Sequence, residues 1–358
     1  MKRLFSLILA LAFLPCAAAF AQDTSKPLTT RSQSAATPSR QITLDVQVTD
    51  KSGSPIRGLQ QSDFTLLDDK HPQAITSFYA VTGHPPSPSD PPVEIILLVD
   101  NVNSGPQTVA FERNQIRQYL LLNGGELPHP VSLVVFTDDG TRVQKDPSQD
   151  GKALATLYDQ YQTGLRSITR SQGIYGAAER FDLSLKTLTS IISYEQSRPG
   201  RKLLVWISPG WPLLSGPNIE LSTRQEQQIF RSIVNYSTSL RDARITLYSI
   251  DPLGLADAGG NRITFYEEFL KGVPSYSRVD PADLSLQVLA VQSGGAVYNS
   301  SNDLSSYIAK CASDATSYYI LTFDSQPADR PDEYHSLEVK IGQHGAIVRT
   351  RTGYYAQP

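Results

Sequence analysis

Residues 94–100 read Glu-Ile-Ile-Leu-Leu-Val-Asp, an almost unbroken apolar run that ends on a carboxylate. A run of this kind is typical of a strand buried on both faces of a sheet, because a half-exposed strand alternates apolar with polar residues. Three later runs share the pattern, at Val131–Phe136, Leu203–Ile207 and Ile245–Ile250. We interpret all four as strands of one buried sheet.

Segments with helical periodicity separate and follow these strands. The clearest helical face holds Ile174, Ala177, Ala178, Phe181, Leu185, Leu188 and Ile192. Further faces hold Ile229, Ile233, Tyr236 and Leu240, then Leu284, Val288 and Val291, then Leu304, Ile308 and Cys311 after a cap at Asn302. Strands that alternate with helices predict an α/β fold with a doubly wound, mostly parallel sheet. Cys311 lies in an apolar face, which favours a small core residue over a reactive thiol.

Short strands with alternating polarity flank this region on both sides. Before it, Ile42 to Val48 alternate strictly, and two more short strands are expected around the polar turn Asp68 to His71. After it, three short strands are expected at Tyr318–Phe323, Ser336–Ile341 and Ala346–Thr350. Neither set is large enough to bury its own apolar face. We therefore predict that segments 41–84 and 317–358 pair as a small β-sandwich, with an α/β domain at 92–316 inserted between them.

The amino terminus predicts export. Lys2 and Arg3 precede an apolar run, and Ala19-Phe20-Ala21 offers a cleavage site for a signal peptidase. We interpret residues 1–21 as a signal peptide and 22–40, rich in Ser, Thr and Pro, as a disordered linker. Cleavage would remove Cys16 and leave Cys311 without a disulfide partner. A secreted or periplasmic protein with no membrane span after cleavage is expected.

Composition limits the classes of partner. The 358 residues carry a net charge of −3, with 40% hydrophobic and 19% charged residues and no block rich in Lys and Arg. A nucleic acid partner needs a concentrated positive surface, so it is not expected here. Signatures of common enzymes, such as a Gly-x-Ser-x-Gly elbow or a His-Glu-x-x-His pair, are not found in the sequence.

Several short motifs together carry a resemblance to a known family. They are Val46-x-Val-Thr-Asp-Lys-x-Gly53, Gly58-Leu59 to Asp63-Phe64, Ile95 to Ser104, Ile250-Asp-Pro-Leu-Gly-Leu255, Tyr318-Tyr-Ile-Leu321 and Val348-Arg-Thr-Arg-Thr-Gly-Tyr-Tyr355. The set resembles the family of von Willebrand factor A (vWFA)-related domains of acidobacterial secreted proteins, over most of the chain. The resemblance implies a vWFA-like, Rossmann-like α/β fold, an exported location and a role in adhesion or scaffolding.

The resemblance also implies where a metal site would lie. In vWFA domains a divalent ion binds at the carboxyl ends of the strands, held by an Asp-x-Ser-x-Ser loop, a Thr and a second Asp. Here Asp100 and Ser104 match that pattern, but Val102 replaces the first Ser and Pro209 stands where the second Asp belongs. Ser171 and Gln172 occupy the Thr position. We expect a degenerate site that binds magnesium weakly at best. The alternative is that Asp100 caps the turn that follows the strand. Asp138, Asp139 and Asp251 also lie at the ends of predicted strands. They could supply missing carboxylate ligands, but a position in a solvated turn is the simpler interpretation.

The function expected from these patterns is a non-catalytic protein-binding or scaffolding module of the cell envelope. The alternatives are a cryptic envelope hydrolase and a metal-dependent adhesin with an incomplete metal site. Trp206 and Trp211 flank the loop Ser208-Pro209-Gly210. Alternation predicts a buried Trp206 and a partly exposed Trp211, which is a candidate anchor for a protein partner or, alternatively, packing over the sheet end. No catalytic residue and no bound cofactor are predicted.

Overall fold

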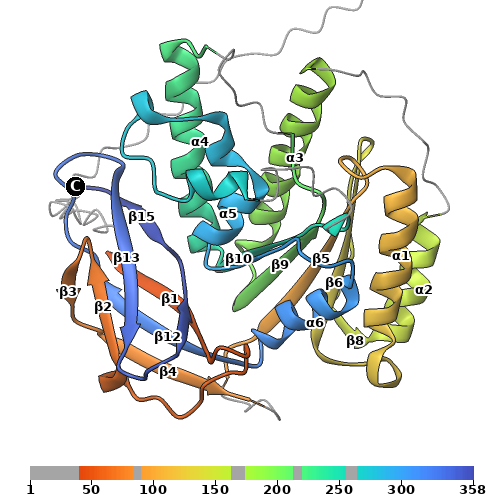
Figure 1. Ribbon diagram of the computed structural model, residues 1–358, viewed down its shortest axis with the longest axis horizontal. Helices are drawn as coiled ribbons and strands as arrows, with labels where there is room; N and C mark the ends of the chain where they lie inside the picture. Colours follow the sequence, from red (N-terminus) through yellow and green to blue (C-terminus); the bar gives the residue numbers. More distant parts are fainter. Residues whose placement is uncertain (1–39, 84–89, 163–173, 213–219, 255–263) are drawn as a thin grey trace, which may run out of the picture. The chain divides into compact units, whose positions relative to one another are not determined.

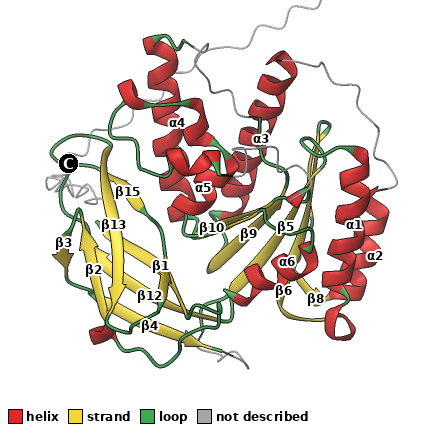
Figure 2. Ribbon diagram, in the orientation of Figure 1, coloured by secondary structure: helices red, strands yellow, loops and turns green. Residues whose placement is uncertain are grey.

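The computed structural model describes residues 40–83, 90–162, 174–212, 220–254 and 264–358. Within them the chain is a mixed α/β protein with one mostly parallel sheet and two antiparallel sheets (Figure 1 and Figure 2). The predicted signal peptide and nearly all of the predicted linker lie outside the described residues, as do Ser171 and Gln172. No helix among the described residues is both long enough and apolar enough to cross a membrane.

The mostly parallel sheet runs in the order β11-β10-β9-β5-β6-β7, with β8 also paired to β6. Its strands are β5 (Val93–Asp100), β6 (Glu126–Thr137), β7 (Gly140–Val143), β8 (Ser148–Asp150), β9 (Arg201–Ile207), β10 (Ile245–Ile250) and β11 (Val297–Tyr298). The neighbours from β11 to β6 pair in parallel, and β7 and β8 pair with β6 antiparallel. The predicted mostly parallel sheet is confirmed, because all four apolar runs form strands of it.

Helices cover both faces of this sheet (Figure 2). They are α1 (Pro106–Leu120), α2 (Gly151–Gln162), α3 (Ile174–Glu195), α4 (Thr223–Asp242), α5 (Leu286–Gln292) and α6 (Leu304–Ser313). Along β5, Ile95 and Leu97 belong to the core with α1, α2 and α6, whereas Ile96 and Leu98 belong to the core with α3, α4 and α5. A continuous apolar run is needed because successive side chains point to opposite, equally buried faces.

The start of α6 differs by one residue from the prediction. Asp303, and not Asn302, is the capping residue, and its Oδ1 accepts a hydrogen bond of 3.0 Å from the Ser306 backbone N–H. A carboxylate at this position also interacts favourably with the positive end of the helix dipole. The apolar face of α6 is as expected, with Leu304, Ile308 and Cys311 fully buried.

The remaining strands form two four-stranded antiparallel sheets, in the orders β14-β1-β12-β4 and β15-β13-β2-β3. Their bounds are β1 (Gln41–Thr49), β2 (Phe64–Asp68), β3 (His71–Gln73), β4 (Ser77–Thr82), β12 (Ser317–Asp324), β13 (Glu333–Ile341), β14 (Ile347–Arg349) and β15 (Gly353–Ala356). Each sheet joins strands from both ends of the chain, and residues of both sheets share one apolar core. The division of the chain into an α/β domain inserted in a β-sandwich stays a prediction.

Four strands lie on each side of the α/β region, where the sequence predicts three. The additional early strand is β3, which follows β2 after a two-residue turn. Asp69 and Lys70 both have positive φ, at 46° and 69°, which is the conformation that tight hairpins require. The additional late strand is β15, which pairs with the first residues of β13.

Charged side chains link the antiparallel sheets to the parallel one. Oδ1 of Asp45 on β1 accepts a hydrogen bond of 2.5 Å from Nη2 of Arg244. Its Oδ2 lies 3.7 Å from Nε of Arg201. Arg201 is 1% exposed, and its guanidinium stacks on the Tyr318 ring at 4.4 Å from the centroid. A buried Arg needs partners of this kind, because its desolvation is otherwise costly.

Candidate functional site

The carboxyl ends of β5, β9 and β10 meet at one edge of the parallel sheet, because these strands run in parallel in register. Val99 on β5 and Ile250 on β10 both pair with Ile207 on β9. The next residues are Asp100, Ser208 and Asp251, so three polar side chains follow three adjacent strands. Open α/β sheets place ligands at this edge. The structure therefore brings the predicted site residue Asp100 to the expected position.

Asp100 is fully buried and its carboxylate accepts hydrogen bonds from four protein N–H groups. Oδ1 accepts from the backbone of Val102 and of Asn103, each at 2.9 Å. Oδ2 accepts from the Asn103 side chain at 2.8 Å and from Nε1 of Trp206 at 3.0 Å. Burial raises the pKa of Asp100, and the hydrogen bonds from Asn103 and Trp206 oppose that rise. A carboxylate has about four acceptor positions, so the protein's own donors use those that a cation would need.

Ser104 faces a different carboxylate. Its hydroxyl donates to Oε1 of Glu112 at 2.9 Å, and Glu112 on α1 is fully buried. Burial raises the pKa of Glu112 well above its usual value, and the negative charges of Asp100 and Asp251 add to the rise. Oε2 of Glu112 has no hydrogen-bond partner among the described residues. The environment thus favours the protonated, neutral form of this acid.

Glu112 is not among the site residues predicted from the sequence, although its position gives a signal. It lies between Val109 and Ile116 on the buried face of α1, at helical spacing. A Glu in an apolar helical stripe is unusual, because Glu is seldom fully buried without a partner. That position could have identified Glu112 as part of the sheet edge.

The other residues at this edge are held by local contacts. Val102 is buried in the apolar core with α3 and α4. Ser208 accepts a hydrogen bond from the Gly210 backbone at 3.1 Å, and Asp251 accepts one from the Leu253 backbone at 2.9 Å. Asp138 and Asp139 form the turn between β6 and β7. The residues of the implied ligand set therefore cap turns or pack in the core. The N–H donors around Asp100 do not suit a divalent ion as a neighbour.

Trp211 is buried, which corrects the expected partial exposure. It is 3% exposed, and its ring packs against Trp206 with centroids 5.0 Å apart and planes at 70°. Phe181 of α3 covers it from another side at 6.5 Å. Residues 213–219, which follow it, lie outside the described residues. The sequence pattern could not reveal this burial, because it is α3 that closes over the ring.

Cys311, His71, His129 and His335 belong to other parts of the described structure. Burial raises the pKa of the Cys311 thiol well above its usual value, which opposes formation of the reactive thiolate. Nε2 of His129 lies 3.0 Å from the Thr316 hydroxyl, and Nδ1 of His335 lies 3.0 Å from Asp68. His71 begins β3 and is exposed, and His84 lies outside the described residues.

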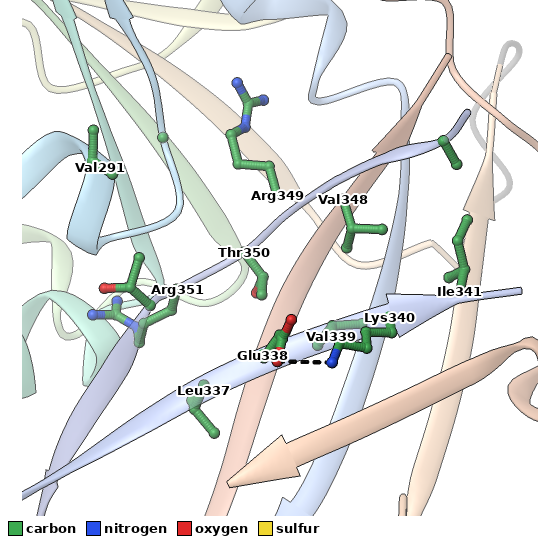
Figure 3. Close-up of a pocket in the computed structure, with 13 residues that line it drawn as sticks. Val291, Leu337, Glu338, Val339, Lys340, Ile341, Val348, Arg349, Thr350 and Arg351 are labelled. Carbon is green, nitrogen blue, oxygen red and sulfur yellow. Dashed lines mark ion pairs between the residues drawn. The ribbon is translucent and has the colours of Figure 1, made fainter. Parts of the chain in front are cut away.

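A groove of about 510 Å³ opens between β13 and β14, next to α5. Figure 3 shows Val348 and Thr350 on the side of β14 that faces β13, whereas Arg349 points away from β13. Leu337 and Val339 beside the groove are each 7% exposed and belong to the core of the antiparallel sheets. A volume of this size lies in the range of sites that bind ligands.

Two arginines beside the groove anchor its wall to the α/β region. Arg349 forms an ion pair with Asp314 and lies over the ring of Tyr248, 5.6 Å from its centroid. Nη1 of Arg351 donates to the Ser237 carbonyl of α4 at 3.2 Å. Burial lowers the pKa of Arg351 to about 10, and the nearby charge of Arg241 adds to this effect. The β14 side of the groove is therefore fixed by contacts that do not occupy its interior.

One edge of β13 has no strand beside it in the groove. β15 pairs only with Glu333–Ser336, and the Leu337 backbone N–H then donates to Thr352 at 2.9 Å. Alternate residues of a strand direct their backbone groups to the same side. The N–H groups of Val339 and Ile341 therefore point into the groove, where no strand among the described residues pairs with them.

Comparison with known proteins gives structural likenesses only. No family model matches the chain, and no curated protein matches it. Among solved structures, the human COPII-coat protein Sec24c is 8% identical over 75% of this chain and 44% of its own, with a TM-score of 0.35. The pilus adhesin SpaC from Lactobacillus rhamnosus GG is 10% identical over 84% of this chain and 49% of its own, with a TM-score of 0.37. The chain thus spans less than half of each of these two proteins. The structures similar to it also include the SpRpn10 VWA domain, 13% identical over 62% of this chain and 94% of its own, with a TM-score of 0.29.

Proposed function

We propose that this chain is a non-catalytic binding module that takes an extended segment of a protein partner onto the free edge of β13. The proposal rests on the groove between β13 and β14, where the N–H groups of Val339 and Ile341 have no strand partner among the described residues. An unpaired strand edge is a template for another strand, since its N–H and C=O groups are already in register to pair.

The floor of the groove suits a segment with apolar side chains at alternate positions. Val339, Ile341, Ala346 and Val348 line it, and all four belong to or pack against the core of the antiparallel sheets. The free stretch of β13 covers about four residues, so an added strand would extend about 13 Å. Backbone hydrogen bonds would supply affinity, and the apolar floor would select side chains.

The charges at the rim add little selectivity. Glu338 and Lys340 form an ion pair of 3.1 Å, and each side chain is 56% exposed (Figure 3). Exposed pairs of this kind contribute about 0–1 kcal/mol. We therefore expect recognition by backbone pairing and apolar contact, with weak dependence on salt.

The sequence supports a partner in the cell envelope or outside the cell. A predicted signal peptide at residues 1–21 and a predicted linker at 22–40 would deliver the folded part beyond the inner membrane. The role would be adhesive or scaffolding, in line with the vWFA-like resemblance. A metal ion would not be needed, because N–H donors surround the carboxylate of Asp100.

The proposal can be tested with a phage-displayed library of random octapeptides selected on the full chain. We expect enriched peptides with alternating apolar residues and micromolar dissociation constants. Binding should slow hydrogen exchange at the amides of Val339 and Ile341, as measured by NMR. Ile341→Pro removes one groove-facing donor and leaves the ladder with β2 intact, so it should weaken binding about tenfold or more.

Two further variants complete the design. Ala346→Trp fills the groove and should also weaken binding at least tenfold. Ile347→Thr changes a side chain that is 52% exposed on β14 and does not line the groove, so it should leave affinity unchanged. Peptides that bind Ile341→Pro and Ala346→Trp as tightly as wild type would disprove the assignment to β13. Turnover of a generic ester or peptide library by the purified chain would favour a cryptic hydrolase instead.

A further inference from the structure

A second cluster of polar side chains lies in the antiparallel sheet β15-β13-β2-β3, away from the edge of the parallel sheet and beside the part of β13 that precedes the groove. Asp68 and Asp69 end β2 and begin the turn to β3, while His335 lies on β13 and Tyr354 on β15. β13 pairs with both neighbours, so that Asp68 is opposite Leu337 and Tyr354 is opposite His335. The strand order β15-β13-β2-β3, visible in Figure 1, therefore brings together residues from both ends of the chain.

The distances within this cluster suit one small ion. Nδ1 of His335 lies 3.0 Å from Oδ1 of Asp68 and 3.8 Å from Oδ2 of Asp69. The three ligand atoms all lie within 4.8 Å of one another. Ligands about 2.0–2.1 Å from a tetrahedral zinc ion are about 3.3 Å apart. The two distances from His335, 3.0 and 3.8 Å, lie on either side of that value.

Neighbouring donors hold both carboxylates in orientation. The Ser336 backbone N–H and hydroxyl donate to Oδ1 of Asp69 at 2.8 and 2.9 Å, which leaves Oδ2 on the side of His335. The Tyr354 hydroxyl donates to Oδ2 of Asp68 at 2.6 Å. Hydrogen bonds of this kind to ligating groups fix their direction and are a regular part of metal sites.

Charge and exposure also fit a cation. Asp68 is 2% exposed, yet within the described residues no Lys or Arg forms an ion pair with it or with Asp69. A buried carboxylate without a countercharge is costly. The side chain of His335 is 12% exposed and that of Asp69 is 48% exposed. The cluster is thus open to solvent on one side, where an ion could enter and where water could supply a further ligand.

We propose that Asp68, Asp69 and His335 form a binding site for a divalent transition metal of the zinc class, with water as the fourth ligand. A mixed set of imidazole and carboxylate groups suits zinc better than magnesium or calcium, which take oxygen ligands only. His335 binds through Nδ1 in its neutral form, and any proton on that atom passes to solvent. The ion ties the β2–β3 hairpin to β13, positions 267 residues apart in the chain.

The test uses the full chain without an affinity tag, freed of metal by dialysis against a chelator. Calorimetric titration with zinc chloride should give one site with a dissociation constant of about 10 µM or lower. Cobalt chloride should give the visible absorption of a tetrahedral ion at the same stoichiometry. Because the ion binds the folded state, a hundredfold excess over the dissociation constant should raise the melting temperature by several degrees.

Three variants decide the assignment. His335→Gln and Asp69→Asn should each weaken zinc binding about thirtyfold or more. Asn tolerates the positive φ of position 69, so this variant keeps the hairpin even if the change at His335 disturbs folding. His71→Gln is the matched control, because His71 lies in the same hairpin but outside the cluster. It should leave zinc affinity unchanged.

The proposal fails if zinc shows no saturable binding up to 1 mM. It also fails if His335→Gln and Asp69→Asn bind as tightly as wild type, since the ion would then be held elsewhere. If His71→Gln loses zinc binding and Asp69→Asn retains it, the ion is bound on the other side of the hairpin and the proposed ligand set is wrong. None of these results depends on peptide binding at the groove, which the variants leave untouched.

Discussion

Asp100 and Asp68 are both carboxylates buried at the end of a strand, and they differ in what surrounds them. Around Asp100 the donors are backbone and side-chain amides, the Trp206 indole and the Ser208 hydroxyl, which keep their protons at any ordinary pH. Around Asp68 the partners are an imidazole and a phenol, with a second carboxylate close by. The donors around Asp100 cannot make room for a cation by releasing a proton. The arrangement around Asp68 can accept one, because an imidazole can exchange its proton for a metal.

Position in a fold therefore does not by itself define a metal site. Asp100 occupies the sheet edge where the vWFA resemblance implies an ion, yet Trp206 donates to it from the neighbouring strand β9. Asp68 occupies a hairpin that no motif identified. The protonation chemistry of the nearest partners, rather than the carboxylate itself, decides which one can bind a cation.

The largest effect should come from Asp100→Ala. The change removes the acceptor of the buried Nε1 of Trp206 and of the backbone N–H groups of Val102 and Asn103, which should cost about 3 kcal/mol of unfolding free energy. Urea denaturation followed by circular dichroism measures the loss. Ser104→Ala, which removes one hydrogen bond, is the control and should cost about 1 kcal/mol. A loss of less than 1 kcal/mol in Asp100→Ala would show that the four bonds do not stabilise the sheet edge.

A matched pair of variants compares the two carboxylates directly. Trp206→Phe and Tyr354→Phe each remove one donor from a buried Asp. We expect losses of about 2 kcal/mol for Trp206→Phe and about 1 kcal/mol for Tyr354→Phe, because the contact of His335 Nδ1 with Asp68 at 3.0 Å remains when the Tyr354 hydroxyl is removed. Chemical denaturation at one pH measures both. Equal losses, or the reverse order, would contradict the proposed difference in their surroundings.

Glu112→Gln should stabilise the protein, and more so as pH rises. The pKa of Glu112 is raised in the folded state, so the native protein holds a proton that the unfolded chain releases above its own pKa of about 4.3. The free energy of unfolding of the wild type therefore falls as pH rises from that value toward the folded pKa. Gln carries no such proton and still accepts from Ser104. The urea midpoint of Glu112→Gln should equal that of wild type near pH 4 and exceed it at pH 7. A gain that does not depend on pH would contradict a raised pKa of Glu112 as its cause.

The smallest expected effect is that of magnesium or calcium. Millimolar amounts of either ion should leave the melting temperature of wild type unchanged, because N–H groups occupy the lone pairs of Asp100. Zinc, added separately, is the positive comparison through the Asp68 cluster. Stabilisation by magnesium that disappears in Asp100→Ala would show that an ion can displace these donors.

Much of the fold could be predicted because local patterns were sufficient. Each strand at the centre of the parallel sheet is largely apolar and buried along its whole length, and such strands require helices on both faces. The short alternating strands at either end predicted partners outside their own segment. Strand β3 was missed because three residues, His71 to Gln73, show no period of their own.

The candidate sites were predictable only in part, because they depend on contacts distant in sequence. Asp100 was identified from the strand that precedes it. Its donor Trp206 is 106 residues away, and pairing of β5 with β9 brings the two together. Likewise, nothing local relates Asp68 to His335, since the register of β2 on β13 alone places them side by side. The groove was not predicted either, because it results from β15 pairing with only the first part of β13.

The pairing of the two chain ends has a consequence for synthesis. Gln41 on β1 pairs with Asp324 on β12, so the ribosome adds 283 residues before the first strand meets its partner. At about 5–20 residues per second this takes about 15–60 s. During that time β1 and β2 present alternating apolar faces and unpaired edges, which other unfinished chains can bind. We therefore expect the nascent chain to depend on chaperones until residues 317–356 emerge, and truncation before these strands to cause aggregation rather than a shorter folded product.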